Sequence, residues 1–360
     1  MSKSFEKLTR AVTRSADAIR SRAEKIIDPP VPFTLDHAHP DQSDLENLEI
    51  ASLYKILEQL TEADISLPQA IRQTVRGQIY FAYEISRSIV SIRGRNLTPQ
   101  QANKIIISCE TAALKKMQAA GLKVHYESEV SPEQVKQKPA LIISTHQGGG
   151  YENYCVQALT GIECGIVLKS ELLELPLLGK TLRAKEAIPV DRREVQSKDP
   201  VRRMKEIQRV ANRIVGHLAN GENMLVFFEG TRSKDGSVAS TEKRQKWATD
   251  LLAAVDKSWD ERTGKLTYTS DTRSDDTPQR GFQKLLLVVN TMTTMPDAPE
   301  DMGVLTRFRL NSTLSAKLLP ADHLKMHETE NLFDPNTLFG TARATLRKML
   351  VRIILERQGK

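Results

Sequence analysis

The hydrophobic pattern of the chain changes near residue 123. Between residues 45 and 122, apolar side chains recur every three or four residues, the spacing of helices that bury one face. The stretches with this spacing are 48–60, 68–90 and 99–120. Thr98 before Pro99 is a typical helix start, because threonine caps a helix and proline suits its first turn. The pattern predicts a small α-helical subdomain over residues 45–122.

From residue 123 onward, short apolar runs alternate with helical stretches. The runs have the length of buried strands and lie at 140–144, 164–168, 187–190, 224–228 and 285–290. Helical spacing lies between them, as at 200–220, and returns at the end of the chain at 338–356. Strands that alternate with helices indicate an α/β fold, which we expect to be a mixed sheet flanked by helices.

One segment, residues 234–280, interrupts this alternation. Its part from residue 256 to 276 is polar and rich in turn-forming residues. Long stretches of this kind usually lie on the surface. The sequence therefore predicts an α/β domain over residues 123–360, with a surface insertion at about 234–280.

The N-terminal 44 residues differ from both regions. Residues 5–27 place apolar side chains at three-, four- and seven-residue steps beside six basic ones: Lys7, Arg10, Arg14, Arg20, Arg22 and Lys25. Four prolines in the following linker, 28–44, oppose regular structure. A basic amphipathic helix can bind an anionic membrane surface. Three alternatives stay open: a helix packed on the protein's own body, a disordered tail, and an organelle transit peptide, against which Glu6, Asp17 and Glu24 count.

Composition narrows the possible environments and partners. The 360 residues contain no apolar run near the ~18 residues that span a bilayer, so no transmembrane segment is expected. Three cysteines without metal-ligand spacing predict buried thiols in a reducing, cytoplasmic compartment and no metal site. The net charge of +7 favours anionic partners. Nucleic acid is not expected among them, because aromatic residues are not interleaved with the basic ones.

Candidate chemistry follows the apolar runs. His146 comes after the first run, Lys169 after the second, and Arg192 and Arg193 after the third. The run at 224–228 leads into Glu229, Gly230, Thr231 and Arg232. Guanidinium groups suit phosphate, and a neutral histidine can take a proton from a hydroxyl. This pattern suggests an enzyme that activates a hydroxyl on a phosphorylated acceptor.

The order of these motifs resembles that of the glycerolipid acyltransferases, the superfamily of glycerol-3-phosphate and lysophosphatidate acyltransferases. The family pattern runs H-x-x-x-x-D, then K-x-E-L…P-x-x-G up to an apolar-D/x-R motif, then F-P-E-G-T-R-S. The chain is similar to it over residues 138–235. The matching positions are His146, Lys169–Leu172, Pro176, Gly179, Val190–Arg192 and Phe228–Ser233.

This resemblance implies transfer of a fatty acyl group from a thioester donor, acyl-CoA or acyl-carrier protein, with no other cofactor. The acceptor would be a hydroxyl of glycerol 3-phosphate or lysophosphatidate in phospholipid synthesis, at a membrane that the protein binds peripherally. His146 would be the base and Glu229 would bind the glycerol hydroxyl. Phosphate would be bound by Arg192 and Arg232, with Arg193 and Lys169 adding positive charge and Gly230 permitting close approach. Thr231 favours the lysophosphatidate type, whereas the helical N-terminal region is similar to plastid-type glycerol-3-phosphate acyltransferases.

The chain departs from the pattern at two positions. The family aspartate, five residues after the histidine, is replaced by Tyr151, and Glu152 follows it. The proline of the last motif is replaced by phenylalanine. We expect Glu152 to orient His146 in place of the aspartate. The alternatives are an orienting group from elsewhere in the fold, or a weak or inactive protein that binds lipid and phosphate.

Overall fold

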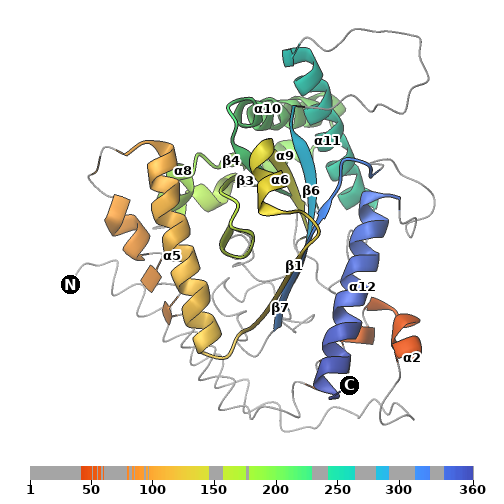
Figure 1. Cartoon of the computed structure of the whole chain (residues 1–360). Coiled ribbons are helices and arrows are strands. Elements are labelled where there is room, and N and C mark those ends of the chain that lie inside the picture. Colours follow the sequence, from red (N-terminus) through yellow and green to blue (C-terminus); the bar gives the residue numbers. More distant parts are fainter. Residues whose placement is uncertain are drawn as a thin grey trace, which may run out of the picture.

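In the part of the chain that the structure describes, seven strands form one mixed sheet with helices on both of its faces (Figure 1). The computed structural model describes residues 42–50, 52–54, 56–57, 60, 79–80, 83–84, 86–92, 95, 97–145, 157–175, 178–228, 242–263, 281–291, 313–324 and 336–359. The predicted basic helix at 5–27 lies outside these residues.

Strand directions divide the sheet into two parts. The strands are β1 (Lys123–Ser128), β2 (Ala140–Ser144), β3 (Cys164–Lys169), β4 (Ile188–Val190), β5 (Asn223–Phe227), β6 (Gln283–Thr291) and β7 (Thr313–Pro320). Their order across the sheet is β1-β7-β6-β2-β5-β3-β4. Every neighbouring pair is parallel except β6 and β7. The predicted mixed sheet flanked by helices is therefore confirmed.

Four of the helices with described bounds have 20 residues or more, namely α5, α10, α11 and α12, and the others are short. They are α2 (Gln42–Glu46), α5 (Pro99–Ala119), α6 (Pro132–Gln137), η1 (Ser170–Leu173, a 3-10 helix), α8 (Leu178–Ala184), α9 (Arg192–Val195), α10 (Pro200–Ala219), α11 (Glu242–Thr263) and α12 (Leu338–Arg357). The predicted start of α5 is confirmed, since the hydroxyl of Thr98 accepts from the backbone N–H of Gln101. None of the described helices has the length and apolarity to span a bilayer.

The sheet is buried on both faces. Leu141 and Ile143 of β2 pack in one core with residues of α10, α11 and α12, whereas Ala140 and Ile142 pack in a second core with residues of α5. Successive strand residues point to opposite faces, so two covered faces require apolar residues at every position. This is why the strands read as continuous apolar runs in the sequence.

The predicted helical subdomain contributes to both cores. Leu45 and Leu53 belong to the first core, and Leu114 and Met117 of α5 belong to the second. Figure 1 shows α2 beside α12 and α5 on the other side of the sheet. The described helices of residues 45–122 thus flank the sheet.

Helix α11 corrects the prediction of a surface insertion at 234–280. Leu251, Leu252 and Val255 are fully buried, and Trp259 packs edge-to-face on Phe282 with 4.8 Å between ring centroids. These residues belong to the first core, so the prediction is wrong for residues 242–263. Their apolar positions have helical spacing, but the charged residues between them gave the segment a polar average. Residues 234–241 and 264–280 lie outside the described part of the chain.

The core position of α11 predicts a large cost for Leu252→Ala. Removing a buried leucine side chain should lower the free energy of unfolding by about 2–5 kcal/mol, which urea denaturation measures. The control is Lys257→Ala on the same helix, whose side chain is 68% exposed and should change stability by less than about 0.5 kcal/mol. Equal, small effects of both changes would contradict the core assignment.

Candidate functional site

The strands that lead into the four motifs lie side by side and point the same way. In sheet order they are β2, β5, β3 and β4, and each neighbouring pair is parallel. We call the shared end of these four strands the carboxyl edge. Ligands of parallel α/β sheets usually bind outside this end of the strands. Segments separated by up to about 85 residues in the sequence are thus brought to one side of the sheet.

The strand register also aligns the motif starts. Ser144 of β2 pairs with Phe227 of β5, and Lys169 of β3 pairs with Val190 of β4. Extending the pairing of Ile166 with Leu225 by three residues sets Lys169 level with Phe228. The described strand ends that precede the four motifs therefore lie at about the same level along the strand direction.

The order in space differs from the order in the chain. β5 carries the last motif, yet it lies between β2 and β3. Neighbouring strands are about 4.8 Å apart, so the end of β4 is about 14 Å from that of β2, while the end of β5 is one spacing away. The strand that leads into Arg232 is therefore closer to the strand that leads into His146 than the strand before Arg192 is.

Thr145 fixes the chain just before His146. It is fully buried, and its backbone N–H donates to the carbonyl of Leu287 at 3.1 Å. Its hydroxyl accepts from the N–H of Val289 at 2.9 Å and donates to the carbonyl of Val289 at 3.1 Å. The predicted residues His146 and Glu152 lie outside the described residues.

Phe228 fixes the chain just before Glu229. Its ring is fully buried and packs edge-to-face on Phe339 of α12, with 5.4 Å between centroids. Its backbone N–H donates to the carbonyl of Ser144 at 3.2 Å, which extends the pairing of β5 with β2. The predicted binding residues after it, Glu229, Gly230, Thr231 and Arg232, lie outside the described part of the chain.

Lys169 stands where the sequence predicted, at the end of β3. It is half-buried and occupies the N-cap position of η1, which is followed along the chain by α8. Gly179 of α8 contacts η1 so closely that a Cβ atom would lie 2.0 Å from the carbonyl oxygen of Leu173. The glycine of the P-x-x-G motif is thus required for helix packing at the carboxyl edge.

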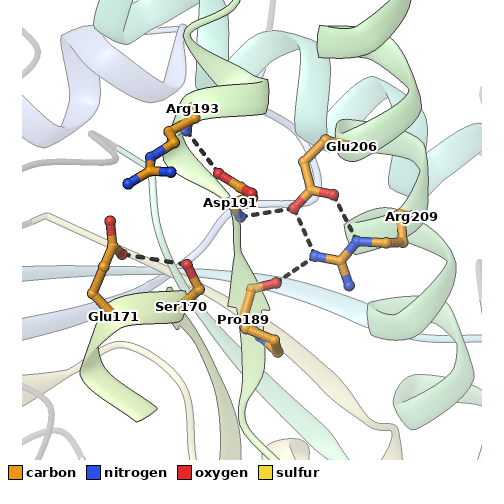
Figure 2. Close-up of polar contacts among 7 residues, drawn as sticks. All are labelled: Ser170, Glu171, Pro189, Asp191, Arg193, Glu206 and Arg209. Carbon is orange, nitrogen blue, oxygen red and sulfur yellow. Dashed lines mark hydrogen bonds and ion pairs between the residues drawn. The ribbon is translucent and has the colours of Figure 1, made fainter. Parts of the chain in front are cut away.

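A hydrogen-bonded group of residues holds the end of β4 (Figure 2). The carboxylate of Asp191 accepts from the backbone N–H of Arg193 at 2.8 Å and caps α9. The N–H of Asp191 donates to Glu206 of α10 at 2.8 Å. Arg209 donates to both oxygens of Glu206 at 2.6 Å, and to the carbonyl of Pro189 at 2.5 Å. Asp191 therefore has a structural part in this group.

Two of these residues, Glu206 and Arg209, were not found from the sequence. Burial opposes ionisation of Glu206, but the hydrogen bonds from Arg209 and from the N–H of Asp191 outweigh it, so the pKa lies below its usual value. A Glu–Arg pair three residues apart is common on helices, so nothing in the sequence marked this one. The pair orients α9, which presents Arg192 half-buried and Arg193 exposed.

The described cysteines are structural. Cys109 and Cys164 are buried free thiols, as predicted, and Cys155 lies outside the described residues. Burial raises the pKa of Cys164 to about 12, so its thiol stays protonated at neutral pH. Gln157 donates to the carbonyl of Cys164 at 2.6 Å, which ties the described helical residues 157–160 to the start of β3.

Two other features lie away from the carboxyl edge. A cavity of about 470 Å³ is lined by α12, β1 and β7, including His125 and Arg352, and contains none of the described motif residues. Ligand atoms of Glu186, His217 and Glu222 lie within 4.8 Å of one another, a geometry that could hold a divalent ion. These three residues come just before β4 and β5, at the opposite end of the strands.

Cationic residues at the carboxyl edge of an α/β sheet are well placed to bind an anionic ligand. The sequence model of the Acyltransferase family matches residues 123–253, which run from β1 into α11 and include every predicted motif. This part of the chain is therefore similar to the Acyltransferase family, in agreement with the reaction type that the motifs predict.

The chain also has a structural similarity to a solved acyltransferase. The chain is similar to the crystal structure of the 1-acyl-sn-glycerophosphate (LPA) acyltransferase PlsC from Thermotoga maritima, with 17% identity and a TM-score of 0.41. The similarity covers 81% of this chain and 98% of that chain. No curated protein matches the chain in sequence.

The contacts of Glu206 predict a pH-dependent cost for Glu206→Gln. The change should lower the free energy of unfolding by about 1–2 kcal/mol at pH 7, since hydrogen bonds to a charged group are lost and Arg209 is partly exposed. A lowered pKa gives stability that is present above the unfolded pKa of about 4.3 and lost as the pH falls through the folded value. The difference from the parent should therefore shrink below about pH 4.

Glu261→Gln is the matched control for this measurement. Glu261 forms an exposed pair with Lys257 at 3.8 Å, and such pairs contribute little to stability. Urea denaturation from pH 7 to pH 3 compares the two variants. A Glu206→Gln variant as stable as Glu261→Gln at pH 7 would show that Glu206 does not hold β4 to α10.

Proposed function

We propose that the protein transfers a fatty acyl group from acyl-CoA or acyl-carrier protein to a hydroxyl of glycerol 3-phosphate or lysophosphatidate, as a step of phospholipid synthesis. The observation that carries the proposal is the carboxyl edge, where the strands leading into all four motifs end side by side. The acyltransferase domain match over residues 123–253 supports the reaction type. The reaction needs no cofactor other than the thioester donor.

His146 is the proposed general base. It takes the proton from the acceptor hydroxyl as the oxygen attacks the thioester carbonyl. The tetrahedral intermediate then expels the thiolate, which takes up a proton from the histidine, so that ester and free thiol form. Glu152 holds the imidazole in the tautomer that accepts this proton.

The basic residues bind the acceptor's phosphate. Arg232 follows the strand next to β2, so it is the nearest cation to His146 in strand order. Arg192, Arg193 and Lys169 follow β4 and β3, one or two strand spacings further on, and add positive potential. Glu229 is proposed to bind the hydroxyl of the glycerol.

Both acceptors stay open in this proposal. The resemblance of Thr231 to the lysophosphatidate type favours lysophosphatidate, whereas the helical region 45–122 is similar to plastid-type glycerol-3-phosphate acyltransferases. Lysophosphatidate resides in membranes, and we propose that the protein binds an anionic membrane surface peripherally, with residues 5–27 taking part. The second candidate function is a lipid- and phosphate-binding protein without turnover, which the tyrosine at the aspartate position favours.

An acceptor screen tests the function directly. Purified protein is incubated with acyl-CoA or acyl-carrier protein and with either acceptor, and mass spectrometry measures the acylated product. The parent should form product with at least one pair, and His146→Ala should lower its rate by about 10²–10⁴-fold. The control is His217→Ala at the other end of the strands, which should keep the parent rate. Near-parental turnover of His146→Ala would refute the mechanism, and no product from the parent would favour the binding protein.

The replacement of the family aspartate generates a second prediction. Glu152→Gln should reduce transfer severely, because a neutral amide allows the wrong imidazole tautomer. Tyr151→Phe should change the rate little, since its ring is retained. The double variant Tyr151→Asp with Glu152→Ala should recover part of the activity, by restoring the family spacing. If Glu152→Gln were as active as the parent while His146→Ala was inactive, the orienting group would have to lie elsewhere.

A further inference from the structure

Helix α10 is longer than the sheet it covers. Its 20 residues extend about 30 Å, whereas the five residues of β5 extend about 17 Å. Only residues 220–222 join its C-terminal end to the start of β5. The excess length must therefore project at the N-terminal end of the helix, beyond the carboxyl edge.

The contacts of α10 with β4 locate where this projection begins. Arg209 bonds the carbonyl of Pro189, and Glu206, three residues earlier, bonds the N–H of Asp191, just past the end of β4. The helix therefore runs antiparallel to β4. With a rise of about 1.5 Å per residue, Val201 lies about 7 Å beyond Asp191 along the helix.

Apolar side chains are exposed on this projection. Val201 is 73% exposed and Met204 is 42% exposed. They lie three residues apart and so share one face of the helix. Leu175, which follows η1 at the end of β3, is also 42% exposed. Three of the six exposed large apolar residues in the described part of the chain thus follow the ends of the two neighbouring strands β3 and β4, and the other three, Ile79, Tyr83 and Val90, lie before α5.

The charge around these residues is mainly positive. Acidic residues in residues 192–205 are Glu194 and Asp199, and the basic ones are Arg192, Arg193, Lys198, Arg202, Arg203 and Lys205. Asp199 caps α10 and lies 3.8 Å from Arg202 in an exposed pair, which holds the arginine only weakly. We define the overhang surface as Leu175, Lys198, Val201, Arg202, Met204 and Lys205.

We propose that the overhang surface docks the carboxyl edge onto a bilayer that contains anionic phospholipids. Exposed apolar side chains can enter the interface between head groups and acyl chains, and each adjacent basic residue gains from the negative surface potential. The inference rests on the proposed function, because an acceptor held in a bilayer requires the carboxyl edge to face that bilayer. Docking through α10 would turn the carboxyl edge towards the bilayer. Membrane binding by residues 5–27 alone would not set this orientation.

Vesicle sedimentation of the full chain tests this surface without any need for turnover. Vesicles of phosphatidylglycerol with phosphatidylcholine are compared with vesicles of phosphatidylcholine alone. Arg202→Gln with Lys205→Gln should lower binding to the anionic vesicles about 25-fold, since each basic residue contributes about fivefold. Val201→Gln with Met204→Gln should lower it about tenfold by removing the inserting groups. Glutamine keeps helix propensity at these exposed positions, so the fold should survive.

The matched control removes the same charge elsewhere. Lys136→Gln with Arg213→Gln changes one exposed lysine on α6, before β2, and one exposed arginine further along α10. This variant should bind the vesicles within about twofold of the parent. Acyl transfer to a water-soluble acceptor should be unchanged in all three double variants. The two assays are independent, because an inactive parent would refute the proposed function while the vesicle result would still test the docking surface.

Two results would overturn the docking proposal. One is equal vesicle binding by the parent and both overhang variants, which would assign membrane binding to another part of the chain. The other is a pair of overhang variants that bind the vesicles as well as the parent does but no longer bind an acidic carrier protein. That result would make the overhang surface a contact site for a protein.

Discussion

The insertion of β5 between β2 and β3 is the constraint on which the candidate site depends. β5 is hydrogen-bonded on both sides, and its central residues Met224, Leu225 and Val226 are buried against both cores. Hydrogen bonds to both neighbouring strands fix the register of β5. This register sets Phe228 level with Thr145, so the chain enters the histidine motif and the arginine motif at the same height.

Helix α10 connects the site to the surface of the molecule. Its middle holds the end of β4 through Glu206 and Arg209, and its first turns project past the carboxyl edge. The same helix therefore determines where Arg192 lies and which side chains surround the edge. Its buried face packs on α11, so the apolar residues of that helix also support the position of the site.

The sequence predicted the elements better than their arrangement. Continuous apolar runs located the five strands from β2 to β6 because both faces of the sheet are buried, and Thr98 marked the start of α5. The central place of β5 could not be predicted, because strand order depends on pairing between segments far apart in the chain. α11 was missed because charged residues conceal its apolar face. The contact of Glu206 with Asp191 depends on tertiary packing, which no local pattern encodes.

The structure gives a physical reason for one departure from the family pattern. Proline has no backbone N–H, so a proline in place of Phe228 could not donate to the carbonyl of Ser144. Phenylalanine makes this bond and adds the ring contact with Phe339. Both interactions restrain the chain immediately before Glu229, the restraint that a rigid proline would otherwise provide. This replacement therefore preserves a restraint on the chain immediately before the last motif.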